Sequence, residues 1–338
     1  MALSIASRRR RSGLVTTTLL AGALLSGCGL LSGCGLLNGS AGQDHGSGGG
    51  GGGKGLEKSD ITVGAMTIVD NATFYLARDK GYFTDEGLHV KVKKFKSTPE
   101  SYPALKSGEL DFTTVNYVSA LRFQAEGTSD FRFVSDGYQA NQDSVIVLGP
   151  RGSKIKDPMD LAGKRVAVHQ PGSVNELLLK AVLRANGVDP DSVRYLPIKF
   201  PDIPAALESG QIDAGSEVEP FITQAEQSIG AVPLFNTITG PTADMPLSGY
   251  ATTADYARKY PKTVAAFQRA MQRAAKEATG NPQSVRPVLR SGAGIDKQIA
   301  SLAKLGTFPT TLTAKRLQRV ADLMRTTATS TRRSMSLH

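Results

Sequence analysis

From residue 61 onward, short apolar runs alternate with helical segments, and this alternation is what most limits the possible folds. The first series predicts strands at 61–66, 88–95 and 110–115, and helices at 71–80, 99–106 and 116–124. A second series predicts strands at 165–168, 193–197 and 212–215, with helices at 174–186 and 203–209. Strand–helix alternation with short connections indicates an α/β fold built on parallel strands. Because 338 residues exceed one compact core, we expect two lobes.

The two series share a weak internal repeat. The segment 103–111 (PALKSGELD) resembles 204–213 (PAALESGQID), and in both a helix ends at Ser-Gly before a strand headed by Asp. Glycine commonly ends helices, so the similarity has a simple local explanation as well. The repeat nevertheless favours two lobes of like construction. The chain after residue 260 is predicted to be helical, with a last helix at 313–325 and no binding residue assigned to it.

The N-terminus has the organisation of a lipoprotein signal peptide. Four consecutive arginines, Arg8 to Arg11, precede an apolar run from Leu14 to Leu25, which is too short to span a bilayer. The string Leu-Leu-Ser-Gly-Cys then ends at Cys28, and it recurs immediately to end at Cys34. We predict a signal peptide at 1–27 and lipidation at Cys28, because the run before it already has a normal length. Cys34 remains the alternative, and either the general or the twin-arginine export route fits the arginine run.

Residues 28–59 are predicted to be a flexible tether behind the lipidated cysteine. The stretch contains Gly48 to Gly53 without interruption, and such a sequence buries no apolar surface. A coil of roughly 25 residues has a root-mean-square reach of about 25–30 Å. We therefore expect an extracytoplasmic, monomeric protein that is held at the cell membrane by its lipid anchor.

Charge and histidine placement argue against two broad classes of function. The formal charge is +10, but Lys and Arg are scattered along the folded part, whereas nucleic-acid binding needs a clustered basic face. The four histidines are isolated, and no motif of a nucleophile, a metal site or a phosphate loop appears. We expect no enzyme activity, cofactor, metal or nucleic-acid partner. His169 either lines a cleft or simply packs in a loop.

Four strings, in order, resemble the binding proteins for sulfonates, nitrate, taurine and thiamine-precursor pyrimidines. They are FYLARDKGYFTDEGL at 74–88, DLAGKRVAV at 160–168 followed by Gly172-Ser173, EPF at 219–221 and YP at 260–261. The resemblance covers about residues 60–305. It implies the type II periplasmic-binding-protein fold, in which two α/β lobes and two crossover segments enclose a ligand cleft. It also implies a solute-binding protein that closes about a small molecule and delivers it to the permease and ATPase of an ABC importer.

The expected domain boundaries follow from this fold. Lobe I is predicted at 60–146 and 247–338, and lobe II at 147–246. The crossovers are expected near 143–150 and 243–250. In such sheets ligands lie beyond the carboxyl ends of the strands, where helix N-termini present free N–H groups.

Eleven residues at these positions are the candidate ligand contacts. They are Thr67, Asp70, Asn71, Asn116, Tyr117, Asp143, Gly172, Ser173, Val174, Glu217 and Glu219. Several are good N-cap residues, so satisfying helix donors is an alternative role, above all for Ser173, which has capping-box spacing to Glu176.

The ligand is left open by the sequence. The expected cleft holds several carboxylates and no obvious Lys or Arg, which favours a neutral or cationic heterocycle over an anion. Two other functions also remain open. One is a surface lipoprotein that presents solute to a membrane receptor. The other is an enzyme like the pyrimidine synthase of thiamine biosynthesis, which shares this fold but carries a Cys-rich motif; no Cys follows Cys34 here.

Overall fold

The computed structural model describes residues 55–335 of the chain, and the side chains of residues 55–328. The predicted signal peptide, both cysteines and most of the predicted tether therefore lie outside the described residues.

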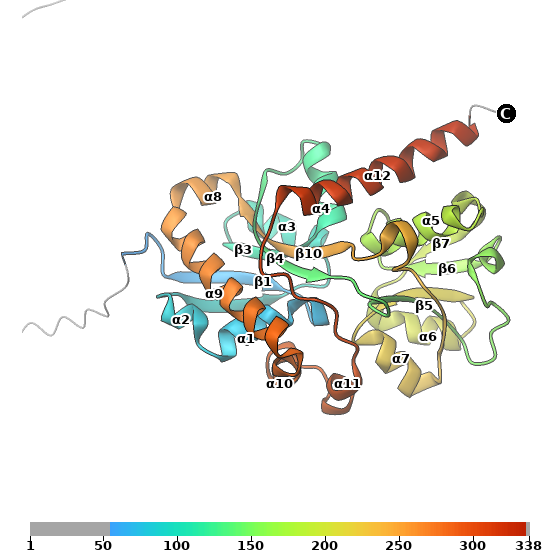
Figure 1. The fold of residues 1–338 in the computed structure, drawn as a ribbon, viewed down its shortest axis with the longest axis horizontal. Coiled ribbons are helices and arrows are strands. Elements are labelled where there is room, and N and C mark those ends of the chain that lie inside the picture. The colour runs from blue at the N-terminus through green and yellow to red at the C-terminus, as the bar shows by residue number, and fades with distance from the viewer. Residues whose placement is uncertain (1–54, 336–338) are drawn as a thin grey trace, which may run out of the picture. The chain divides into compact units, whose positions relative to one another are not determined.

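Two five-stranded sheets form the framework, each with its own helices (Figure 1). The first sheet has the order β2-β1-β3-β10-β4, with β1 (Asp60–Ala65), β2 (His89–Lys94), β3 (Phe112–Asn116), β4 (Phe131–Gln139) and β10 (Pro246–Thr253). The second has the order β7-β6-β8-β5-β9, with β5 (Val145–Gly149), β6 (Arg165–Val168), β7 (Arg194–Pro197), β8 (Ala214–Val218) and β9 (Val232–Asn236). We call the first sheet with the helices packed on it lobe I, and the second sheet with its helices lobe II.

The helices divide between the lobes. Lobe I has α1 (Ala72–Asp79), α2 (Tyr82–Asp85), α3 (Thr98–Lys106), α4 (Tyr117–Ala125), α8 (Ala254–Lys259), α9 (Pro261–Gly280) and α10 (Val285–Val288). Lobe II has α5 (Val174–Ala185), α6 (Ile203–Glu208) and α7 (Phe221–Ile229), while α11 (Lys297–Leu302) contacts α10 and α7. The last helix, α12 (Ala314–Met335), packs on both α4 and α5 (Figure 1). Single turns are η1 (Val69–Asn71), η2 (Pro158–Leu161), η3 (Pro190–Ser192), η4 (Phe200–Asp202), η5 (Gly240–Thr242), η6 (Pro282–Ser284) and the π-turn η7 (Leu289–Ala293).

Both sheets are mixed rather than wholly parallel. The strands β2-β1-β3 and β7-β6-β8 are parallel, as the alternation predicts. In contrast, β10 is antiparallel to β3 and β4, and β5 is antiparallel to β8 and β9. These two strands arrive from the other lobe, and each starts beside the carboxyl end of its parallel neighbour, with Val145 opposite Val218 and Ser248 opposite Asn116. Because each of the two strands enters its sheet at that end, it runs antiparallel to the neighbouring strands.

The segments that connect the two sheets are residues 140–144 and 237–245. The crossovers expected near 143–150 and 243–250 overlap these connections at 143–144 and 243–245, and their later residues form strands. The apolar runs 145–149 and 246–250 instead pair as β5 and β10, where their buried side chains join the two cores.

The internal repeat has one hydrogen-bond pattern in both lobes. Asp111 donates its N–H to the carbonyl of Thr62 and accepts the N–H of Thr62 on Oδ2, both at 2.8 Å. Asp213 forms the same pair with Arg165, again at 2.8 Å for both bonds. In each lobe the aspartate therefore fixes the start of one parallel strand against its neighbour.

Helix α9 supplies much of the apolar contact in lobe I. Its ring of Phe267 stacks on Phe112 of β3, with centroids 4.1 Å apart and planes at 5°, and lies 5.4 Å from Phe83. All three rings are buried, and each fully buried aromatic stabilises the fold by about 1.5–3 kcal/mol. This packing fixes α9 on β3, whose carboxyl end reaches the site.

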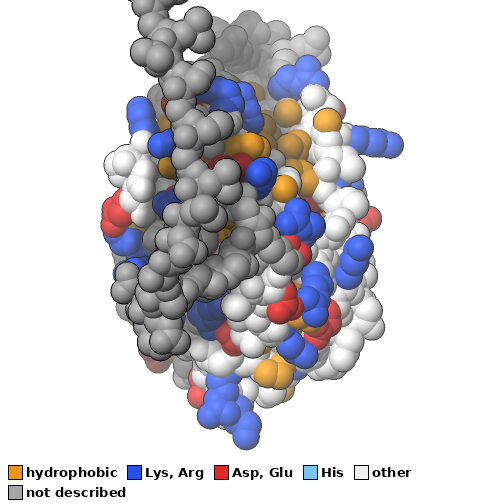
Figure 2. All heavy atoms as spheres, turned by 90° about the vertical axis from the view of Figure 1, so that its left-hand side faces the viewer, with side chains coloured by type: hydrophobic (Ala, Val, Ile, Leu, Met, Phe, Trp, Pro, Cys, Tyr) orange, Lys and Arg blue, Asp and Glu red, His pale blue; other side chains and the backbone are white. Residues whose placement is uncertain are grey.

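Two further properties of the described chain are the hydropathy of its helices and the distribution of its surface charge. Within residues 55–335, no helix combines the length and the apolar character that crossing a bilayer requires. On the face in Figure 2, over the described residues, basic side chains are interspersed with acidic ones.

Candidate functional site

A cleft lies between the lobes, and it contains two adjoining cavities. The first, which we call the polar cavity, has a free volume of about 40 Å³. The second, which we call the aromatic cavity, has a free volume of about 340 Å³. Both are lined by Met66 and Ile68 of lobe I and by His169 and Phe200 of lobe II. Each cavity is thus built from both lobes.

The polar cavity is lined by groups that follow strand ends. Asp70 lies in η1 after β1, Asn116 ends β3, and Asn175 lies in the first turn of α5. Ser248 of β10 donates to Oδ2 of Asp70 at 2.8 Å. Asp70 is otherwise buried, and its burial raises the pKa of the carboxyl to about 6.

The aromatic cavity has a wall of stacked rings from lobe II. His169 stacks on Phe200 with centroids 4.1 Å apart at 12°, and Phe200 stacks on Phe221 at 5.9 Å and 22°. The Nε2 atom of His169 lies 3.1 Å from the carbonyl of Lys96 in lobe I, an arrangement in which Nε2 donates. Burial lowers the pKa of His169 to about 4, so the ring is neutral near pH 7. The structure therefore places His169 in the cleft rather than in a plain loop.

Hydrogen bonds join the lobes along the cleft. The N–H of Val69 donates to the carbonyl of Glu219 at 3.3 Å, and Nε2 of Gln170 donates to Oγ of Ser119 at 3.4 Å. Arg122 of α4 reaches the carbonyl of Pro171 at 3.5 Å. The structure thus has the two lobes in contact.

Four of the eleven expected residues line the cleft. Asp70, Asn116 and Val174 line the polar cavity, and Thr67 lines the aromatic cavity. Asn116 also caps α4, because its Oδ1 accepts the N–H of Ser119 at 3.1 Å. Capping and cavity lining are therefore combined in one residue.

Asn71 and Tyr117 are buried structural residues that line neither cavity. Asn71 accepts the N–H of Met66 and donates to Thr114 and Tyr250, so its side chain is fully used. The hydroxyl of Tyr117 donates to Asp136 inside lobe I at 2.9 Å. Both were expected to contact ligand, but the structure places their side chains in the core of lobe I, away from both cavities.

Gly172 and Ser173 lie beside the cleft, in a separate cavity of about 210 Å³ under α12. Ser173 is the N-cap of α5 and accepts the N–H of Glu176. Ser173 therefore has the helix-capping role that was the alternative to ligand contact. Neither residue lines the polar or the aromatic cavity, which corrects the prediction that they do.

The remaining three candidates also lie outside both cavities. The side chain of Asp143 is 52% exposed, 4.0 Å from the ammonium of Lys304. Glu217 and Glu219 are buried in lobe II, and burial holds the pKa of each carboxyl above its ordinary value, which favours the protonated form. Glu219 accepts from Thr223 and from the N–H of Lys304.

The expectation of a carboxylate-rich cleft without lysines is also wrong. Lys94, Lys96 and Lys199 all line the aromatic cavity, where Glu100 is the one acidic lining residue of the described chain. The lysines were missed because they come from the ends of edge strands β2 and β7, which have no pattern of ligand contact in the sequence. A signal was available in Lys93, Lys94 and Lys96, which lie at and just beyond the end of a strand.

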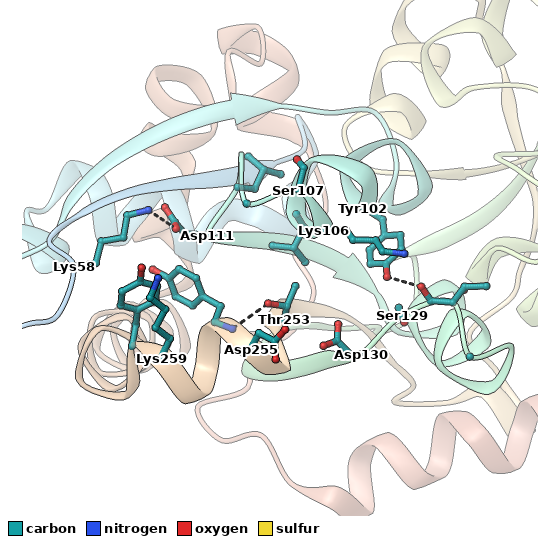
Figure 3. Close-up of a pocket in the computed structure, with 17 residues that line it drawn as sticks. Lys58, Tyr102, Lys106, Ser107, Asp111, Ser129, Asp130, Thr253, Asp255 and Lys259 are labelled. Carbon is teal, nitrogen blue, oxygen red and sulfur yellow. Dashed lines mark hydrogen bonds and ion pairs between the residues drawn. The ribbon is translucent and has the colours of Figure 1, made fainter. Parts of the chain in front are cut away.

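A larger cavity of about 640 Å³ lies within lobe I, and residues of that lobe alone line it (Figure 3). Some of its polar lining groups bond within the protein. Lys58 bonds Asp111 at 2.6 Å, and the hydroxyl of Tyr102 donates to the carbonyl of Thr128 at 2.5 Å (Figure 3). Because the lining of this cavity comes from one lobe, we take the inter-lobe cleft as the candidate site.

Within the described residues, no group of three or more His, Cys, Asp or Glu side chains is arranged to hold a metal ion.

Comparison with known proteins relates the chain to solute-binding proteins. It is 28% identical over 207 residues to a putative aliphatic sulfonates-binding protein of Bacillus subtilis, covering 59% of this chain and 60% of that protein's length. It is 26% identical over 223 residues to the taurine-binding periplasmic protein of Escherichia coli, covering 66% and 68%. The match to the nitrate/nitrite binding protein of Synechococcus elongatus is 27% over 305 residues, covering 78% and 65%. The chain thus spans about three fifths of the length of the Bacillus relative.

Solved structures show the same fold. The alkanesulfonate-binding protein SsuA of Xanthomonas axonopodis, bound to MOPS, superposes with a TM-score of 0.67 at 20% identity, covering 80% of this chain and 94% of that one. SsuA of Escherichia coli gives 0.66 at 19%, covering 82% and 94%. A Candida albicans protein described as having the generic periplasmic binding protein fold also gives 0.66, at 14% identity, covering 80% and 91%. The fold is therefore the expected one.

The family model described as NMT1/THI5 like matches residues 69–285, which include every strand but β1 and all the residues that line the two cavities except Met66, Thr67 and Ile68. The bacterial relatives named above are binding proteins rather than enzymes, in agreement with the sequence analysis. The chain belongs to the NMT1/THI5-like family.

Proposed function

We propose that this chain is the extracytoplasmic solute-binding protein of an ABC importer, which captures one small molecule by hinge closure and delivers it to the permease. The observation that supports this most directly is a cleft lined from both lobes, with His169 and Phe200 facing Met66 and Ile68. A solute in this cleft contacts both lobes only when they are together. Its binding energy therefore favours the closed state.

The hinge consists of the two connecting segments, residues 140–144 and 237–245. In this proposal the lobes follow the boundaries expected from sequence, 60–146 with 247–338 and 147–246, adjusted so that β5 belongs wholly to lobe II and β10 wholly to lobe I, and they move as bodies about the hinge. Closure forms the inter-lobe bonds from Val69 to Glu219 and from Gln170 to Ser119, and opening breaks them. The permease, driven by its ATPase, receives the solute when the lobes open.

Hinge closure is tested by ligand screening followed by single-molecule energy transfer. A thermal-shift panel of taurine, nitrate, sulfonates, polyamines and pyrimidines identifies solutes that raise Tm, since a ligand of the folded state stabilises it by mass action. The full-length protein then carries one dye at position 106 in lobe I and one at position 208 in lobe II, both exposed. We expect energy transfer to increase with each solute that binds. Saturating binding with unchanged energy transfer would contradict hinge closure.

The membrane anchor is part of the same proposal. Cys28, with Cys34 as the alternative, carries the lipid, and residues 28–59 allow the lobes to reach the permease. Metabolic labelling with an alkyne fatty acid tests this in the producing cell. We expect label on the wild type and on Cys34→Ala, and its loss in Cys28→Ala. Label retained when both cysteines are replaced would exclude anchoring at either.

A further inference from the structure

Lysines from both lobes line the aromatic cavity. Lys94 and Lys96 lie at and after the end of β2 in lobe I, and Lys199 lies after β7 in lobe II. Glu100 is the one acidic residue in this lining, and its Oε2 accepts the N–H of Lys96 at 2.9 Å. The lining therefore carries an excess of positive charge.

Among the side chains that the structure describes, none of these three lysines forms an ion pair with a carboxylate. Lys94 donates to the carbonyl of Ala293 at 3.2 Å. Lys96 and Lys199 are exposed, and within residues 55–335 neither forms an ion pair with a carboxylate. Closing the lobes brings these two like charges to one cavity, which costs electrostatic energy. An anion placed with them removes that cost and makes closure depend on the anion.

The wall beside the lysines suits a flat ring. His169, Phe200 and Phe221 form a continuous stack of three rings in lobe II. The histidine is neutral near pH 7, because burial lowers its pKa to about 4, so the wall adds no charge of its own. Aromatic ligands gain from stacking on such faces beyond the apolar area that they bury.

The two volumes limit the size of the ligand. The aromatic cavity, at about 340 Å³, falls at the small end of the range of about 300–1,000 Å³ for small-molecule sites. The adjoining polar cavity has about 40 Å³, which accommodates a single small polar substituent beside Asp70 and Asn175. One ring with one acidic group fits this space.

We propose that the cleft selects an aromatic organic anion of the sulfonate or carboxylate type, with its ring on the His169–Phe200–Phe221 stack and its acidic group between Lys96 and Lys199. This inference rests on the proposed solute-binding function and names its ligand class. Charge selects the anion and drives closure, while the ring stack discriminates against aliphatic anions. The sequence alone favours a neutral or cationic heterocycle, because it gives no indication that the lysines share the cleft.

Three probes separate the contributions of charge and ring. Benzenesulfonate has both, methanesulfonate has the charge alone, and benzenesulfonamide has the ring without the charge. By isothermal titration of the full-length protein in nanodiscs, we expect benzenesulfonate to bind at least about tenfold tighter than either other probe. Its affinity should also fall with added NaCl, since the two lysines are exposed to solvent.

Matched variants assign the effects to residues. We expect Lys96→Gln and Lys199→Gln each to weaken benzenesulfonate binding about tenfold or more, and to leave benzenesulfonamide binding unchanged. Phe200→Leu keeps an apolar side chain and should weaken benzenesulfonate without affecting methanesulfonate. Lys106→Gln is the control, because Lys106 is exposed in lobe I outside the cleft. Thermal unfolding verifies that each variant is folded.

The outcomes distinguish this inference from the proposed function. Methanesulfonate binding as tightly as benzenesulfonate, no binding of benzenesulfonate, or unchanged affinity in both lysine variants would overturn the aromatic-anion assignment. If another solute then still increased energy transfer between the lobes, the solute-binding function would stand. A protein whose lobes close on no solute would overturn both.

Discussion

Asp70 shows how one buried group in the cleft couples pH to stability. The carboxyl is buried in lobe I, accepts a hydrogen bond from Ser248, and has its pKa raised from 3.8 to about 6 by burial. The nearest titratable groups that respond to its charge are Tyr138 and Tyr250, whose own pKa values burial raises, so both stay neutral around pH 6. Asp70 is therefore the group among these three that changes charge there.

The sign of the effect follows from the direction of the shift. Between about pH 4 and 6 the folded protein holds a proton on Asp70 that the unfolded chain has lost, so stability rises as pH falls through this window. We expect Asp70→Asn, measured without ligand, to raise the free energy of unfolding at pH 7 by about 2 kcal/mol. The gain should shrink toward zero below pH 4. Urea unfolding at several pH values tests this. The same dependence of the unfolding free energy on pH in Asp70→Asn and the wild type would contradict it.

At the scale of the element, helix α12 is longer than its sequence pattern predicts, and it forms a buried ion pair with lobe I. The predicted helix covers 313–325, whereas α12 continues to Met335. Near its start, Arg316 bonds Asp136 through Nε at 2.5 Å and Gln139 through Nη1 at 2.6 Å. The Asp136 side chain is completely buried and also accepts from Tyr117. Arg316 thus fixes the helix to β4 and neutralises a charge inside lobe I.

Removing that arginine leaves a buried carboxylate without its cation. We expect Arg316→Met to lower the free energy of unfolding by roughly 3 kcal/mol, the usual cost of breaking a buried pair. Burial already raises the pKa of Asp136, and losing the cation raises it further, so the variant should recover stability as acidification protonates the group. Lys315→Met, at an exposed neighbouring position, is the control for thermal unfolding. Equal losses in both variants would rule out the pair as the cause.

At the scale of the whole molecule, one glycine lies at the contact between the lobes. Gly172 of lobe II has φ +67°, and a Cβ there would lie 2.9 Å from Cζ of Arg122 in lobe I. The absence of a side chain lets Arg122 rest against the lobe II backbone and reach the carbonyl of Pro171. Helix α12 covers the same junction, since it packs on α4 and α5 (Figure 1).

We expect Gly172→Ala to weaken solute binding about three- to tenfold, because the methyl group displaces Arg122 and hinders closure. Gly187→Ala is a matched control: Gly187 has φ +75° at the end of α5, and nothing lies within 4 Å of an added Cβ. Both substitutions introduce similar backbone strain of about 1 kcal/mol. Titration and inter-lobe energy transfer should change in the first variant alone. Equal effects in both would attribute the loss to strain.

Much of the fold follows from short-range patterns in the sequence. Ser173 and Asn116 start helices through bonds to residues three positions later, and such contacts are readable from local spacing. The resemblance in 74–88, 160–168 and 219–221 leads to the family, which the match over 69–285 shows. Parallel strands place their carboxyl ends at one edge, so Asp70, Asn116 and Val174 were found in the cleft.

The chemical character of the cleft was decided by the tertiary structure. Whether Glu217 and Glu219 face the solute or the interior depends on strand register and on the backbone around them, and the two share no local signal that distinguishes these outcomes. Lys96 and Lys199 are 103 positions apart in numbering (96 to 199) and meet at one cavity only because lobe packing brings two edge strands together. The sequence by itself determined the elements and the family, because local hydrogen bonds and periodicity encode them. The charge and shape of the site depend on long-range packing, which no single segment of the chain encodes.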